Sequence, residues 1–184
     1  MNKAWMLIAA TTVLTSGCGY NRIQTLDEEV NAFKGQIEVQ LQRRADLVPN
    51  LVNTVKGFAA QELEIFDRVT SARAQLGGAI ESGDLAAMAA ANQTLTTALG
   101  RLIAIAEDNP EIQSNENFRM LQDQLEGTEN RISTARQDYN ASVREYNAYI
   151  RRFPQVLTAK VIGAGSHEYF EAEAGAAEVP DVQF

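Results

Sequence analysis

The residue with the clearest chemical potential in this chain is its one cysteine, Cys18, which closes the segment Leu14-Thr15-Ser16-Gly17-Cys18. Lys3 and an apolar run over residues 4–14 precede it, and the two residues before the cysteine are the small ones that a signal peptidase accepts. A cysteine at this place is typical of bacterial proteins whose thiol is acylated and becomes the new N-terminus. The sequence therefore predicts a signal peptide over residues 1–17 and a lipidated tether over residues 18–24.

Two other interpretations of this segment stay open, an uncleaved membrane anchor and an ordinary free or buried thiol. A spanning helix needs about 20 mostly apolar residues, whereas the run before Asn21 is shorter and is diluted by threonine and serine. Thr15 stands where lipidated proteins usually have leucine, which weakens the lipidation pattern without removing it. We favour lipidation, and either membrane interpretation places the body of the protein outside the cytoplasm. An acylated Cys18 also leaves no thiol for a disulfide.

The other residues that do chemistry in enzymes are sparse. Nucleophilic catalysis needs a nucleophile beside a base, and the one histidine, His167, lies in a loose C-terminal stretch where we expect it to be solvated. Haem or zinc would need several histidine, cysteine or methionine ligands at ordered spacings. The carboxylates Glu168, Glu171 and Glu173 are expected to form a solvated acidic tail rather than a cation site. We therefore expect no enzyme activity, no cofactor and no metal.

A set of polar residues at helical positions is the remaining candidate for a site. Tyr139-Asn140 and Tyr146-Asn147 repeat after seven residues. One interpretation is that these residues satisfy one another and fix the register of packed helices, as buried asparagines do in coiled coils. The other is a recognition patch at one end of a bundle, and the structural interpretation is favoured. The full candidate set comprises Arg43, Arg44, Asp46, Asn130, Arg136, Tyr139, Asn140, Tyr146 and Asn147.

The overall charge limits the possible partners. The formal net charge is −8 over 184 residues, and it becomes −9 when residues 1–17 are removed, because Lys3 is the only charged side chain among them. Such a chain is a poor electrostatic partner for nucleic acid or for an anionic bilayer. Membrane attachment is therefore expected to come from acyl chains. The remaining 167 residues suffice for one domain with a proper core.

The elements that must position these residues are helices. Thr25 to Glu28 has the pattern of a capping box, and apolar residues then recur at steps of three and four as far as Leu76. Pro49 interrupts this pattern, so residues 26–76 form either two helices broken there or one long kinked helix. Gly77-Gly78 is expected to end the segment. A further helix follows from Leu85 to Ile103, and Asn109 is expected to cap a short turn that begins with proline.

The last helix has the clearest pattern. Its apolar seam alternates steps of three and four from Phe118 to Phe153, which predicts a helix over about residues 117–152. This helix would be about 54 Å long at 1.5 Å per residue, and its unbroken repeat favours nearly aligned packing, as in helix bundles and coiled coils. The helical period is lost after Pro154. Residues 154–184 are therefore expected to form an extended, partly ordered strap over a bundle of residues 25–153.

Several segments resemble the LemA family of bacterial membrane-associated proteins. The longest is residues 36–52, Gln-Ile-Glu-Val-Gln-Leu-Gln-Arg-Arg-Ala-Asp-Leu-Val-Pro-Asn-Leu-Val. Similar stretches recur at residues 55–59, 115–132, 139–154 and 169–172 and at the terminal Val182-Gln183-Phe184. The resemblance implies an all-α, antiparallel four-helix bundle tethered at its N-terminus, with separate helices before and after Pro49. It supplies no catalytic residues. Family members usually begin with a full transmembrane helix, from which the short signal and Cys18 depart.

The sequence thus predicts a lipid-anchored extracytoplasmic scaffold or interaction protein with a protein partner, no nucleic acid and no catalysis. In a cell with two membranes, Gly19 after the lipidated cysteine favours the outer one, because it is not the aspartate that retains lipoproteins at the inner membrane. The alternative is a periplasmic bundle that binds a small molecule or a peptide in a polar pocket lined by Tyr139, Asn140, Tyr146 and Asn147. A membrane-bound hydrolase or metalloprotein is the third class, and we reject it.

Overall fold

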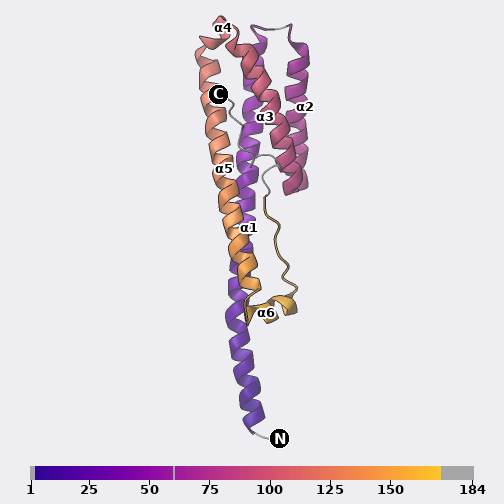
Figure 1. Ribbon diagram of the computed structural model, residues 1–184, viewed down its shortest axis with the longest axis vertical. Helices are drawn as coiled ribbons and strands as arrows, with labels where there is room; N and C mark the ends of the chain where they lie inside the picture. The colour runs from indigo at the N-terminus through magenta and orange to yellow at the C-terminus, as the bar shows by residue number, and fades with distance from the viewer. Residues whose placement is uncertain (1–2, 60, 171–184) are drawn as a thin grey trace, which may run out of the picture. The chain divides into compact units, whose positions relative to one another are not determined.

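The computed structural model describes residues 3–59 and 61–170, with side chains from Gly19 onward (Figure 1). Helices and their connections make up this part of the chain, and it contains no strand, so the predicted all-α class is confirmed. The helices are α1 (Lys3–Lys56), α2 (Leu63–Ser82), α3 (Leu85–Glu107), α4 (Pro110–Gln113), α5 (Glu116–Ile150) and α6 (Gln155–Ile162).

The chain divides into two compact units, and each is described by itself. Of the described residues, the first unit comprises 3–36 and 135–169, and the second comprises 37–59, 61–134 and 170. The first therefore contains the N-terminal part of α1, the C-terminal part of α5, α6 and the segment that follows α6. The second contains the rest of α1 and α5 together with α2, α3 and α4. The predictions for Glu171, Glu173 and the terminal Val182-Gln183-Phe184 fall outside the described residues.

Helix α1 runs through Pro49 and ends at Lys56, so the break expected at Pro49 is wrong. A proline inside a helix removes one amide donor and leaves the carbonyl four residues earlier without its usual partner. Here that carbonyl belongs to Ala45, and the Nε of Arg73 on α2 donates to it at 2.8 Å. The side chain of a neighbouring helix thus replaces the missing backbone bond. The chain turns instead after Gly57, where the amides of Phe58 and Ala59 both bond the Val55 carbonyl at 3.0 Å.

The capping box expected at Thr25 is also wrong. Helix α1 is continuous from Lys3, so Thr25 lies inside it and not at its start. The Thr25 hydroxyl donates to the carbonyl of Asn21, one turn earlier, at 2.9 Å. A threonine in a helix interior commonly makes this bond, because its hydroxyl can reach back to the preceding turn.

Helices α2 and α3 form a hairpin, and they lie side by side in Figure 1. Gly77-Gly78 does not end α2 as expected; the helix continues to Ser82, and Gly83 with φ 67° terminates it. This left-handed conformation suits glycine, which has no Cβ to clash. Asp84 then starts α3 by accepting hydrogen bonds from the amides of Ala86 and Ala87 at 2.9 and 3.1 Å. A glycine inside a helix costs about 1 kcal/mol relative to alanine, which the packing of α2 tolerates.

The two predictions that follow in the chain are confirmed. Asn109 caps α4 by accepting from the amide of Glu111 at 3.0 Å, with Pro110 as the first helical residue. Helix α5 covers nearly the predicted range. The seam of α5 is buried from Phe118 to Tyr146, but Phe153 is 81% exposed and not part of it. The reason is that α5 ends at Ile150, so the following turn carries Phe153 out of the helical period.

Of the residues expected to form an extended strap, 164–170 are irregular, whereas Gln155–Ile162 form the helix α6. Helix α6 ends at Gly163, whose φ is 72° and whose amide bonds the Ala159 carbonyl. Eight residues span little more than two turns, too few for a periodic pattern to stand out.

Candidate functional site

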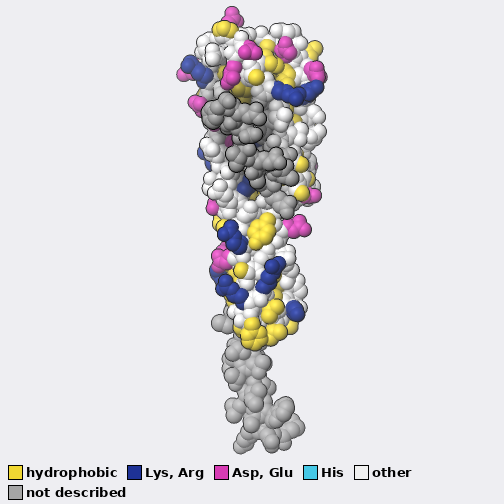
Figure 2. All heavy atoms as spheres, viewed as in Figure 1, with side chains coloured by type: hydrophobic (Ala, Val, Ile, Leu, Met, Phe, Trp, Pro, Cys, Tyr) yellow, Lys and Arg dark blue, Asp and Glu magenta, His cyan; other side chains and the backbone are white. Residues whose placement is uncertain are grey.

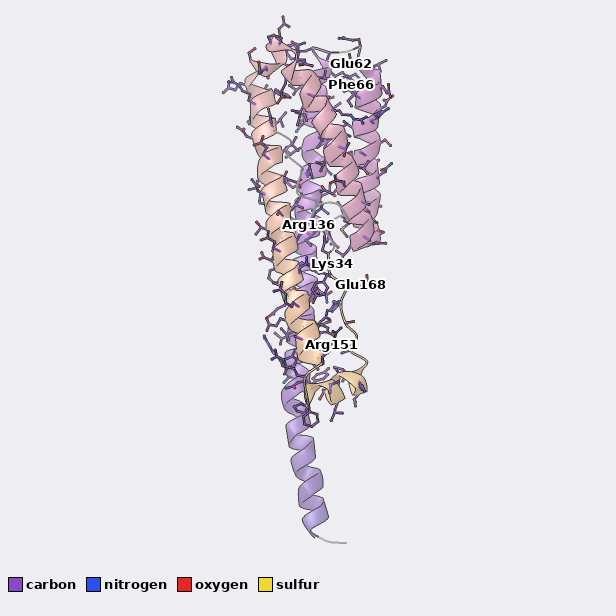
Figure 3. All side chains as sticks on the ribbon, viewed as in Figure 1. Lys34, Glu62, Phe66, Arg136, Arg151 and Glu168 are labelled. Atoms are coloured by element: carbon purple, nitrogen blue, oxygen red, sulfur yellow. The ribbon has the colours of Figure 1, made fainter. Side chains whose placement is uncertain are left out.

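The predicted polar set divides between the two units. Arg43, Arg44, Asp46 and Asn130 belong to the second unit, and the other five members belong to the C-terminal part of α5 in the first. Figure 3 shows the side chains of the described residues, with Arg136 labelled on α5 and Glu168 on the segment after α6.

In the first unit, the side-chain amide of Asn147 holds the backbone of His167. Its Nδ2 donates to the His167 carbonyl and its Oδ1 accepts from the His167 amide, both at 2.9 Å. Asn147 is 5% exposed, so neither half of the amide could be left without a partner at low cost. Asn147 thus bonds both the backbone amide and the backbone carbonyl of His167, as a neighbouring β-strand would.

Tyr139, two turns earlier on α5, makes the second contact to the same segment. Its hydroxyl donates to the Glu168 carbonyl at 2.9 Å. Burial raises the pKa of this hydroxyl above its ordinary value of 10.0, and the negative charge of Glu168 adds to the effect. Tyr139 therefore stays a neutral donor over the physiological pH range. Asp27 of α1 and Tyr146 of α5 contact the same segment through the side chain of His167. We call Asp27, Tyr139, Tyr146 and Asn147, with the segment 163–169 that they hold, the clasp.

His167 is not the solvated loop residue that its position suggested. Its Nε2 lies 2.6 Å from Oδ1 of Asp27 on α1, and its ring centroid lies 4.7 Å from that of Tyr146 on α5. An ionised carboxylate can only accept, so the imidazole donates from Nε2. Burial, followed by the charge of Asp27, raises the pKa of Tyr146. Asp27 is 140 residues and Asn147 is 20 residues away from His167 in sequence, and no local spacing could have indicated these partners.

A cavity of about 410 Å³ adjoins the clasp. Ile23, Gln24 and Asp27 of α1 and Tyr146 of α5 form one side, and residues 162–167 form the other. A carboxylate, an imidazole and a phenol thus all line this cavity. In hydrolases an Asp–His pair orients a general base toward a nucleophile, but no hydroxyl or thiol of the described residues hydrogen-bonds the other ring nitrogen of His167. The described residues also contain no group of three or more His, Cys, Asp or Glu side chains that could hold a metal ion.

The remaining members of the first group, Arg136 and Asn140, are half-buried on α5. The favoured sequence interpretation held that the tyrosines and asparagines of this helix satisfy one another. Tyr139, Tyr146 and Asn147 instead contact the segment after α6.

In the second unit, Arg44 joins three helices. It lies on α1 and is 5% exposed, its Nη1 donates to Oδ1 of Asn92 on α3 at 2.8 Å, and the same atom pairs with the carboxylate of Glu129 on α5. Asn92 is 2% exposed, whereas the Glu129 side chain is 44% exposed. A buried guanidinium needs such partners, because an unpaired charge in a protein interior is strongly unfavourable. The interpretation that the polar residues fix the register of packed helices therefore suits Arg44.

The other three residues of the second group lie at the surface. Asp46 accepts from Nε2 of Gln42 at 2.8 Å, one turn away on the same helix. Arg43 borders a shallow cavity of about 260 Å³ together with Leu47, Gln124, Thr128 and Arg131. Asn130 is exposed, and its carbonyl accepts from the Thr134 hydroxyl at 3.0 Å. An exposed side-chain contact such as that between Gln42 and Asp46 contributes at most about 1 kcal/mol to stability.

Comparison with known proteins decides the family. The LemA family model matches residues 34–184, which is well over half of the chain. The chain belongs to the LemA family.

Curated LemA-type relatives include two magnetosome proteins. Magnetosome protein MamQ 2 of Paramagnetospirillum magneticum is 33% identical over 175 residues, a match that covers 83% of this chain and 64% of the relative. Magnetosome protein MamQ of Magnetospirillum gryphiswaldense is 32% identical over 174 residues, which covers 82% of this chain and 64% of the relative. The chain therefore spans about 64% of the length of these relatives, and neither name states a catalytic activity.

For this LemA-family chain, the described helices include none that is both long and apolar enough to cross a membrane. Sequence reasoning also missed Asp27 in the first unit and Asn92 and Glu129 in the second, and it wrongly placed His167 in solvent. Only Glu129 carried a signal, because it lies in one of the segments that resemble the family, one residue before Asn130. The others were ordinary polar residues in ordinary helical or loop positions.

Proposed function

We propose that this LemA-family protein is a lipid-anchored, extracytoplasmic helical scaffold that acts by holding polypeptide segments and not by catalysis. The observation that carries the proposal is the clasp. The side chains best suited to chemistry, His167, Tyr139 and Tyr146, are engaged in the contacts that hold the segment 163–169. A group with that structural duty is poorly placed to turn over a substrate.

The bonds of the clasp suit a scaffold because two of its side chains recognise backbone. Asn147 and Tyr139 bond main-chain atoms of residues 167 and 168. Such bonds do not depend on the side chains of the bound segment, so the same donors and acceptors fit an irregular segment of another protein. We propose a protein partner of this kind, and no nucleic acid.

The N-terminal sequence supports the proposed anchor. Cys18 follows a short apolar run and two small residues, as expected for acylation. One acyl chain binds a membrane only weakly, whereas two or more hold a protein stably. In a cell with two membranes, Gly19 favours the outer one.

The anchor is tested by replacing its cysteine. Cys18→Ser is expected to release the protein from the membrane fraction or to leave an uncleaved precursor, and the intact mass should lose the mass of the acyl groups. Ser16→Ala is the matched control, since alanine keeps the small residue that cleavage needs. An unchanged mass and unchanged fractionation of Cys18→Ser would contradict lipidation.

The absence of catalysis is tested at His167. If any turnover were measured with the purified protein, His167→Ala should not abolish it. Loss of a measured activity in this variant would overturn the scaffold proposal and favour a hydrolase.

A second candidate function is the binding of a small molecule or peptide in the 410 Å³ cavity. Its lining by Asp27, Tyr146 and His167 favours this candidate, because binding pockets combine an apolar wall with a few convergent polar groups. A photoreactive residue in place of Gln24, which lines the cavity, should then capture a partner in native membranes. The same probe in place of Gln137, exposed on α5, is the control. Equal capture of partners at positions 24 and 137 would contradict ligand binding in the cavity.

A further inference from the structure

Helix α6 presents an apolar face to solvent. Leu157 is 56% exposed and Val161 is 87% exposed, and they lie four residues apart on one side of the helix. Phe153, four residues before Leu157, is 81% exposed. Scattered exposed apolar residues are ordinary, but large ones gathered on one face mark a surface that meets another apolar phase. We call Phe153, Leu157 and Val161 the α6 face.

The α6 face lies beside the predicted acylation site. A Cβ added at Gly19 would be 3.5 Å from Cγ of Gln155 and 3.8 Å from Oγ1 of Thr158, so α6 packs against α1 one residue after Cys18. Tyr20, the next residue of α1, is 46% exposed. In Figure 1, α6 runs crosswise to α1 at the end of α5.

Positive charge surrounds the same face. Arg151, Arg152 and Lys160 are all exposed, and the sequence has no acidic residue between Glu145 and Glu168. Figure 2 shows yellow apolar side chains gathered over α6 with blue basic side chains around them, and Figure 3 labels Arg151 beside α6. The net charge of the whole chain does not cancel this local charge, because salt screens charges more than about 10 Å away.

From these observations we infer that the α6 face and its three basic residues form a second membrane contact, which lies in the interface of a bilayer containing anionic lipids. The inference rests on the proposed anchor, since acyl chains on Cys18 would bring this face to the bilayer. Apolar side chains with flanking Lys and Arg are the combination that binds anionic interfaces, and tyrosine is enriched at that depth. A soluble protein partner would explain the apolar residues but would not require the basic residues beside them.

The inference predicts that Phe153 lies within the bilayer interface, and a fluorescent probe at this position tests it. The chain has one tryptophan, Trp5, which lies within the predicted signal peptide. In a Trp5→Phe background, Phe153→Trp therefore supplies a single fluorescent probe whether or not cleavage occurs. The purified full chain is reconstituted into vesicles of phosphatidylcholine and phosphatidylglycerol, with and without brominated acyl chains. Val39→Trp, at a residue that is 61% exposed in the second unit, is the matched control.

We expect brominated lipid to quench the emission of the Phe153→Trp variant several-fold more than that of the Val39→Trp variant. Equal, weak quenching in both variants would overturn the inference. Protection of the probe at position 153 from an aqueous quencher, without quenching by lipid, would also overturn it, because the face would then be covered by protein. The anchor is judged separately, from flotation of the unsubstituted chain with the vesicles. Flotation combined with an unquenched probe at position 153 would retain the anchor and reject the second contact.

A charge variant sharpens the test. Replacing Arg151, Arg152 and Lys160 by glutamine leaves the apolar residues in place. Each basic residue near an anionic surface contributes roughly fivefold to binding, so the triple variant should bind the surface about a hundredfold more weakly. Lipid quenching of the Phe153→Trp probe should fall in vesicles with phosphatidylglycerol and match the level in phosphatidylcholine alone. Quenching unchanged by the three substitutions would show that charge has no part in the contact.

Discussion

The two units of this protein hold their polar residues together in different ways. In the second unit, Arg44 is buried with a full charge, and side chains from two further helices bond its guanidinium. In the first unit, Asn147 and Tyr139 are buried and neutral, and they bind the backbone of an irregular segment. One arrangement joins helix to helix, and the other joins helix to loop.

This difference determines whether the arginine network or the clasp can break its bonds while the rest of its unit stays folded. Removing one partner of a buried charge leaves the other partner's charge or dipole uncompensated in the interior, so such a network opens only with the unit itself. The backbone atoms of residues 167 and 168 can return to water when the segment leaves, because the segment lies at the surface. The clasp is therefore the part of the molecule suited to reversible exchange, and the arginine network is suited to fixing register.

The largest expected effect is in the second unit. Arg44→Met should destabilise that unit by about 3 kcal/mol, because Asn92 is left buried without its donor and the ion pair with Glu129 is lost. Chemical denaturation measures the change. The neighbouring Arg43→Met is the matched control and should change stability by less than about 0.5 kcal/mol, as an exposed substitution does. Equal losses in the two variants would remove the distinction between buried and exposed arginine.

A smaller and more local effect is expected in the clasp. Asn147→Ala should cost the docked segment about 2 kcal/mol through the loss of two hydrogen bonds to His167. Amide exchange of residues 163–169 should then accelerate about thirtyfold, while exchange in α2 and α3 stays unchanged. Gln137→Ala, at an exposed position of α5, is the control. A loss of protection that spread through the second unit would contradict the local character of the clasp.

The third effect concerns Pro49, where the Arg73 side chain replaces the backbone hydrogen bond that the proline cannot make. Arg73→Met should cost about 1 kcal/mol, because the Ala45 carbonyl loses its donor. In a Pro49→Ala background the restored amide can bond that carbonyl, so Arg73→Met should cost less there. The double-mutant cycle measures this coupling by denaturation. Additive effects would mean that Arg73 does not compensate for the proline.

The same residues show what sequence alone can and cannot predict. The helices of this protein follow from apolar periodicity, and the cap at Asn109 follows from local turn chemistry. The continuity at Pro49 did not follow, because it depends on Arg73 from another helix. His167 was misjudged for the same reason, since its partners come from α1 and α5. Local pattern predicts what a segment does with its neighbours in sequence, whereas a site is completed by residues that only folding brings together.

The smallest effect is a dependence on pH confined to the first unit. All five tyrosines of the chain lie in that unit. Folding raises the pKa of Tyr139 and Tyr146 above 10.0. Between pH 10.0 and the folded pKa, the unfolded chain has released protons that the folded chain still holds, so stability is complete below pH 10.0 and falls as the pH rises through the folded pKa.

Ultraviolet absorbance of tyrosinate measures this directly, because the second unit has no tyrosine to contribute. Titration of the folded protein should include a late part that Tyr139→Phe and Tyr146→Phe each reduce. Exchange of residues 163–169 should accelerate over the same pH range in the unsubstituted protein, since ionised Tyr139 can no longer donate to the Glu168 carbonyl. If the segment were released well below pH 10.0, its hold would depend on another group, and the Asp27–His167 pair would be the one to replace next.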